Sequence, residues 1–147
     1  MSILSQASVI TFVATANPRA AREFYEGILG LPFVEDSPFA LVFDLHGTML
    51  RIHKVKQVVQ TTYTDLGWQV ADIKAAVQEL TAAGVTFERF DGMPQDELGI
   101  WATPDGSAVA WFKDPDGNTL SIAQFATGEV ETGPSASSTQ NPQPPPQ

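Results

Sequence analysis

The same order of predicted elements occurs twice along this chain: a strand, then a helix, then further strands. The first helix begins at Asn17-Pro18, where Asn caps the helix and Pro fills its first turn, and it ends at Gly30. The second helix begins at Asp72 and ends at Gly84. A repeat of this size is too short to bury a stable core by itself, so the two repeats are expected to share one fold.

The segments around the two helices have the apolar or alternating pattern that is typical of strands. This predicts an α+β fold of two βαβββ modules. The modules span about residues 8–56 and 62–126 of a single domain, 1–126, and a Pro- and Gln-rich segment, 127–147, is predicted to be a disordered tail. The predicted strands are 9–14, 32–35, 39–45, 49–54, 66–70, 86–89, 99–103, 109–113 and 119–124.

Side chains alternate between the two faces of a strand, which separates an apolar face from a more polar one. Leu50 and Ile52 lie on the apolar face in the first module, and an amphipathic helix is present to cover it. The pattern leaves open whether the other face meets solvent or lines a ligand-binding cup. The polar residues predicted on that other face are Arg51, His53, Asp65, Gln69 and Ser121.

Composition excludes several classes of function. The net charge of -9 argues against binding to nucleic acid, which needs clustered Lys and Arg. The chain has no Cys, which excludes thiolate metal sites and cysteine nucleophiles. No apolar run approaches the roughly 20 residues of a membrane helix, and the first residues lack a basic signal region, so we expect no membrane partner and a cytoplasmic location.

Three motifs together resemble the vicinal oxygen chelate superfamily, the group of glyoxalases, bleomycin-resistance proteins and ring-cleaving dioxygenases. They are the first helix with its Leu29-Gly30-Leu31 end, the second helix from Asp72 to Gly84, and the turn Asp114-Pro115-Asp116-Gly117-Asn118 after Phe112-Lys113. The resemblance covers about residues 8–125. It implies paired βαβββ modules that form a curved mixed sheet around a cup between them, and a homodimer. It implies function less well, because the superfamily includes metal enzymes and metal-free binding proteins.

The resemblance also implies where a metal would bind: on the first and last strand of each module. Those positions correspond to Ile10 and Asp65 on the first strands, and to Arg51 and Ser121 on the last strands. Ile10 has no donor atom and Arg51 cannot deprotonate, so Asp65 is the only good ligand type among them. No metal site and no cofactor are therefore predicted.

Several residues have both a functional and a structural interpretation. His53 is a general base or a strand histidine bonded to a neighbour. Arg51 either contacts an anionic or carbonyl group of a ligand or pairs with Asp65 as a brace. Trp101 is a wall of the ligand site or ordinary packing.

The sequence thus predicts a metal-independent, bleomycin-resistance-like protein that binds a small organic molecule. The contacts are assigned to Arg51, His53, Asp65, Gln69, Ser121 and Trp101. The alternative is an enzyme of the superfamily, a lyase, isomerase or dioxygenase, with His53 and Asp65 as catalytic residues or with a divalent metal in an unusual ligand set. The sequence leaves open whether the chain catalyses a reaction.

Overall fold

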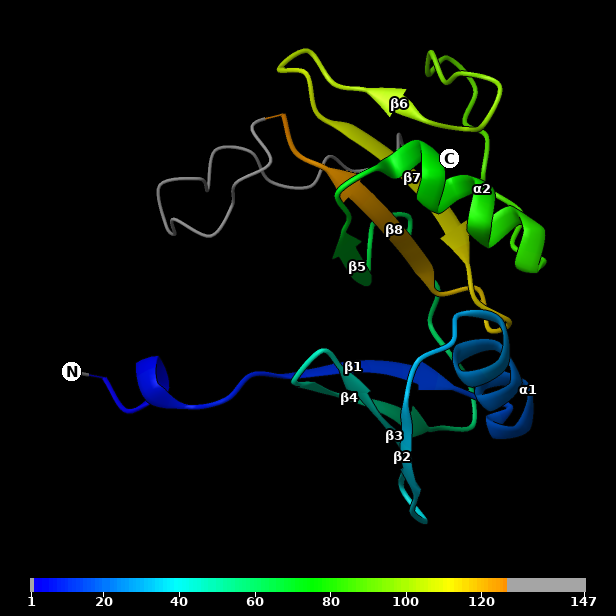
Figure 1. The fold of residues 1–147 in the computed structure, drawn as a ribbon. Helices are drawn as coiled ribbons and strands as arrows, with labels where there is room; N and C mark the ends of the chain where they lie inside the picture. The colour runs from blue at the N-terminus through cyan, green and yellow to red at the C-terminus, as the bar shows by residue number, and fades with distance from the viewer. Residues whose placement is uncertain (1, 127–147) are drawn as a thin grey trace. The chain divides into compact units, whose positions relative to one another are not determined.

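The computed structural model describes residues 2–126, and the predicted tail, 127–147, lies outside this range. The chain divides into two compact units, with the boundary between Val59 and Gln60. Each unit holds one four-stranded sheet, in the orders β1-β4-β3-β2 and β5-β8-β7-β6. The α+β class and the βαβββ order predicted from the sequence are confirmed, and Figure 1 shows both units.

The first unit begins with a short turn of 3-10 helix, η1 (Leu4–Gln6), followed by the sheet and one helical segment. Its strands are β1 (Ile10–Thr15), β2 (Phe33–Asp36), β3 (Ala40–Leu45) and β4 (Thr48–Lys54). β4 is parallel to β1 and antiparallel to β3. Phe43, Leu50 and Ile52 are fully buried on the face that the helical segment covers, and Tyr25 of that segment packs against Phe43 with ring centroids 6.0 Å apart.

The helical segment of the first unit is not one regular α-helix, as the sequence pattern predicted. α1 (Pro18–Arg22) continues into η2 (Glu23–Ile28), a stretch of π-helix. The wider turn appears as the bond from Leu29 N to Phe24 O, which spans five residues. Asn17 caps the start and Gly30 ends the segment with φ of 73°, as expected.

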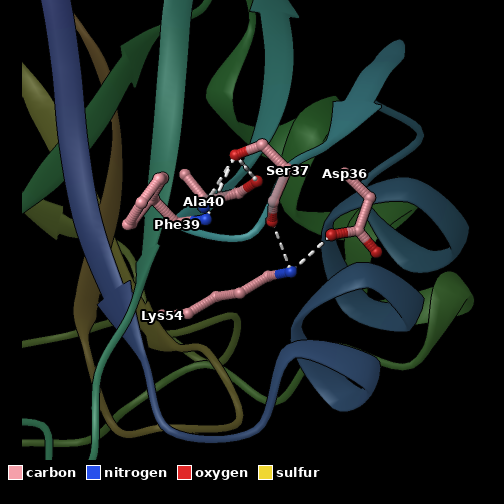
Figure 2. Close-up of polar contacts among 5 residues, drawn as sticks. All are labelled: Asp36, Ser37, Phe39, Ala40 and Lys54. Carbon is pink, nitrogen blue, oxygen red and sulfur yellow. Dashed lines mark hydrogen bonds and ion pairs between the residues drawn. The ribbon is translucent and has the colours of Figure 1, made fainter.

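A lysine fixes the hairpin between β2 and β3. The Lys54 ammonium donates to Asp36 Oδ1 and to the Ser37 carbonyl, at 2.5 and 2.7 Å (Figure 2). The Ser37 hydroxyl oxygen accepts from the backbone N–H groups of Phe39 and Ala40. The end of β4 is therefore tied to the neighbouring hairpin by side-chain bonds as well as by the sheet.

The second unit repeats the plan of the first. Its strands are β5 (Leu66–Gln69), β6 (Trp101–Ala102), β7 (Ala108–Lys113) and β8 (Thr119–Gln124), and α2 (Ile73–Ala83) packs against β7 and β8. Asp72 caps α2 by accepting from Ala75 N, and Gly84 ends it with φ of 115°. In the turn before β7, the Thr103 hydroxyl and the Ser107 N–H hold the pKa of Asp105 below its usual range.

Two strand predictions in the second unit are wrong in extent. Residues 86–89 form no strand, and only Phe87 makes an isolated bridge, to Phe112. The Gln95 side chain forms hydrogen bonds with backbone groups in and next to this segment: it donates to Glu88 O and accepts from Phe90 N. The strand predicted at 99–103 is only β6, because Gly99 has φ of 88° and Thr103 already belongs to the next turn.

Candidate functional site

The exposed face of the first sheet is the candidate site, and it is formed by β1 and β4. These parallel strands lie side by side (Figure 1), with Phe12 directly beside Arg51 and Ala14 beside His53. Because side chains alternate along a strand, Ile10, Phe12, Met49, Arg51 and His53 share this face. Ile10, Phe12 and Met49 are 46%, 51% and 40% exposed, an unusual gathering of open apolar side chains on one sheet.

Arg51 is half-buried on this face, and its guanidinium makes no ion pair or hydrogen bond within residues 2–59. Three other basic side chains of the unit do have acidic partners: Arg19 pairs with Glu23, Arg22 with Glu26, and Lys54 with Asp36. Partial burial removes water from the guanidinium, and this desolvation is unfavourable as long as no hydrogen-bond partner replaces the water. An added anion would supply that partner, so Arg51 is available to bind one.

His53 lies at the end of the same face and is exposed. Its ring meets the Phe12 ring edge-on, with centroids 5.0 Å apart and planes at 71°. Within the residues that the structure describes, neither ring nitrogen has a hydrogen-bond partner. The imidazole can therefore accept or donate a proton to a bound molecule.

In the second unit, Asp65 serves to hold the segment before β5 against β8. Its Oδ2 accepts from Thr119 N at 3.0 Å, and the Thr61 hydroxyl lies 3.0 and 3.1 Å from its two carboxylate oxygens. Asp65 N also donates to Thr119 O at 2.8 Å. These bonds give Asp65 a structural role that the sequence analysis did not foresee.

Ser121 is only 1% exposed, so its hydroxyl is buried. Thr64 stands beside it: the Thr64 hydroxyl lies 3.3 Å from Ser121 Oγ and accepts from Trp111 Nε1 at 3.2 Å. The sequence analysis missed Thr64, which only its contacts across the fold reveal. Gln69 is exposed at the end of β5.

The face of the second sheet that was predicted to be polar is instead covered by an apolar cluster. Val109, Trp111 and Ala123 are buried there, and Phe90, Met93, Trp101 and Phe125 pack over them. Trp101 stacks on Trp111 with ring centroids 6.1 Å apart. The structure thus shows the packing role of Trp101, and it leaves the first sheet as the more open of the two.

The metal-ligand positions implied by the resemblance do not form a donor set. In the first unit Ile10 lies beside Met49, and Arg51 beside Phe12, so neither pair offers two metal-binding atoms. Within residues 2–126, no three His, Cys, Asp or Glu side chains come together in a way that could hold a metal ion. The residues present do not fit the metal of the superfamily's enzymes.

A groove of about 890 Å³ lies elsewhere on the first unit, along α1 and η2. Its charged lining includes Arg19, Glu23, Arg22 and Glu26, which already form two ion pairs with one another. The guanidinium of Arg22 also lies 3.6 Å from the centre of the Phe33 ring. Because these side chains are already partnered, we place the candidate site on the Arg51 face and not in this groove.

Comparison with known proteins identifies the family. Residues 7–122 match the family model of the Glyoxalase/Bleomycin resistance protein/Dioxygenase superfamily. This match spans most of the chain, and the chain therefore belongs to that superfamily. A search of curated proteins finds no match.

Solved structures share the fold at low sequence identity. A lactoylglutathione lyase from Agrobacterium tumefaciens is 19% identical with a TM-score of 0.62, and the alignment covers 86% of this chain and 98% of that protein. A glyoxalase family protein from Enterococcus faecalis is 19% identical with a TM-score of 0.63, covering 82% and 99%. A glyoxalase/bleomycin resistance protein/dioxygenase from Nocardioides is 17% identical with a TM-score of 0.63, covering 86% and 89%. At these identities the likeness concerns the fold alone.

Within residues 2–126, no helix has the length and apolar character needed to cross a membrane.

Proposed function

We propose that this chain is a metal-independent binding protein for a small organic molecule, which binds on the exposed face of the first sheet. One observation carries the proposal: Arg51, at a position where the family resemblance implies a metal ligand, is half-buried and has no partner within its unit. A guanidinium has donors only and cannot ligate a metal. It is well suited to hold an anionic or carbonyl group of an organic ligand.

Electrostatics supports the metal-free interpretation. A dication about 4 Å from a guanidinium would meet roughly 8 kcal/mol of repulsion at a surface-like dielectric. A metal would need several strong donors to offset this, and Ile10 beside Met49 supplies no carboxylate or imidazole. Asp65, the one good ligand type among the implied positions, already accepts hydrogen bonds from Thr61 and Thr119.

The alternative is an enzyme of the superfamily, a lyase, isomerase or dioxygenase. The exposed His53, with both ring nitrogens unpartnered within the described residues, favours this alternative, and one structure with the same fold is named a lactoylglutathione lyase. It predicts turnover that His53→Ala abolishes while ligand affinity changes little. It also predicts either bound Zn, Ni, Mn or Fe in the purified protein or an acid–base reaction without metal.

Amide NMR on the chelator-treated full chain tests the binding proposal. The probes are benzoate, benzylamine and benzyl alcohol, which are similar in size and carry negative, positive and no charge. We expect at least one probe to give saturable shifts at Phe12, Met49, Arg51 and His53, unchanged by further chelator. The proposal is wrong if no probe shifts these residues, or if the shifts need an added metal ion.

Two predictions from the sequence stay predictions: a cytoplasmic location and a homodimer. Light scattering of the purified chain measures the second directly.

A further inference from the structure

The neighbours of Arg51 define what kind of group it can bind. Phe12 on β1 and Val42 on β3 lie directly beside it in the sheet, so both cross-strand neighbours are uncharged. The next acidic side chain along β3, Asp44, accepts a hydrogen bond from Gly47 N at 3.1 Å and makes no ion pair with Arg51. The guanidinium therefore presents a positive charge between two apolar neighbours, with Glu35 of β2 one strand further away beside Val42, and a charge-assisted bond there is stronger than a neutral one.

The apolar surroundings include an aromatic surface. Phe12 is 51% exposed, and the edge-on contact with His53 holds its ring at one end of the site. An exposed ring fixed in this way offers its face to another planar group, which gains stacking energy in addition to burial. Phe12 and Arg51 lie on adjacent strands at the same register position, so one small molecule can touch both.

We infer that the ligand is a planar aromatic carboxylate, whose ring lies on Phe12 and whose carboxylate binds the Arg51 guanidinium. This inference rests on the proposed function and narrows it to one chemical class. The carboxylate matches the paired donors of the guanidinium, which favours two parallel hydrogen bonds. The overall charge of -9 does not oppose this binding at contact distance, because charges more than about 10 Å away are largely screened at 0.1 M salt.

Three probes of similar shape separate the two parts of this inference. They are naphthoate, its neutral amide naphthamide, and decalin carboxylate, which keeps the charge and loses the aromatic rings. Titration calorimetry on the full chain is expected to show naphthoate binding about tenfold or more tighter than either of the other two. The affinity for naphthoate is expected to fall as KCl is raised, because the ion pair is partly exposed.

Two variants assign the preferences to residues. Arg51→Gln should remove the preference for naphthoate over naphthamide, and Phe12→Leu the preference for naphthoate over decalin carboxylate. The matched controls are Arg19→Gln, which removes the same charge from an exposed helix position, and Phe39→Leu, which alters a phenylalanine that is 74% exposed on the hairpin. Both controls should bind naphthoate as the unaltered chain does.

The outcomes distinguish this inference from the function it rests on. Equal binding of naphthoate and naphthamide, with amide shifts at Phe12 and His53, would keep the binding function and overturn the carboxylate class. Equal binding of naphthoate and decalin carboxylate would overturn the aromatic part. Absence of binding by all three probes up to about 10 mM would overturn the class, whereas the proposed function fails only if benzoate, benzylamine and benzyl alcohol also give no shifts.

Discussion

Gly117 allows a contact between two distant segments of the second unit. It has φ of 87°, and a Cβ at this position would collide with the Gln60 side chain, which donates from Nε2 to Asp116 O at 3.0 Å. Asp114 completes the turn by accepting from the N–H groups of Asp116 and Asn118. The segment that precedes β5 is thus fastened to the turn between β7 and β8.

Gly117→Ala should destabilise the second unit by about 2–3 kcal/mol, since it combines left-handed strain with loss of the Gln60 bond. The three Trp residues all belong to this unit, so urea unfolding followed by Trp fluorescence reads its stability directly. Gly92→Ala is the matched control in the same unit, because its φ of 82° is similar and nothing lies within 4 Å of a Cβ there. A loss of stability as large in the control as in Gly117→Ala would contradict the explanation.

At the same scale, the alternation of side chains along a strand predicts which residues share a face, but it does not predict whether that face is exposed. Arg51 and Ser121 occupy corresponding positions in the two repeats, yet Arg51 is half-buried and unpaired in its unit whereas Ser121 is 1% exposed. Ser121 lies against Thr64 and beside Trp111 in the sheet, and Phe90 and Met93 pack over the cluster that includes Trp111 from a loop that no local pattern defines. Phe12 was missed for the converse reason: an apolar residue on a strand gives no sign that it is exposed.

At the scale of elements, local signals predicted the helix ends well. Asn17, Gly30, Asp72 and Gly84 act through bonds and dihedral angles within a few residues, so the sequence contains the necessary information. Residues 86–89 fail as a strand although Glu88 N donates to Trp111 O at 2.8 Å, because the Glu88 carbonyl bonds the Gln95 side chain in place of a strand's backbone. The π-helical turn of η2 was also missed, since its apolar spacing differs little from that of an α-helix.

The loop from Glu88 to Ile100 depends on Gln95, whose amide bonds Phe90 N, Glu88 O and Gly99 O at 2.8, 2.9 and 2.9 Å. Gln95→Ala should cost about 1–3 kcal/mol and speed hydrogen exchange at Phe90 and Ile100. Acrylamide should then quench Trp fluorescence more strongly, because Phe90 and Met93 of this loop pack over the cluster that contains Trp111.

Gln78→Ala is the control for this change, since Gln78 is exposed on α2 and Ala suits a helix. If exchange in the loop is the same in both variants, Gln95 does not organise it.

At the scale of the whole molecule, the strand and helix pattern predicted the repeated fold and three motifs predicted the family, but neither fixes the chemistry. Residues 7–122 match a superfamily whose description includes several functions, and shared fold alone does not choose among them. The proposed function therefore rests on side chains: Arg51, Phe12 and His53 gather on the first sheet.

The central claim is that this member of the superfamily binds its ligand without a metal, and isothermal titration of the chelator-treated full chain with Zn²⁺, Ni²⁺, Mn²⁺ and Fe²⁺ tests it most directly. The account predicts no stoichiometric binding of any of these ions in the micromolar range, in the unaltered chain or in Asp65→Asn. One ion bound per chain with micromolar affinity, and lost in Asp65→Asn, would contradict it.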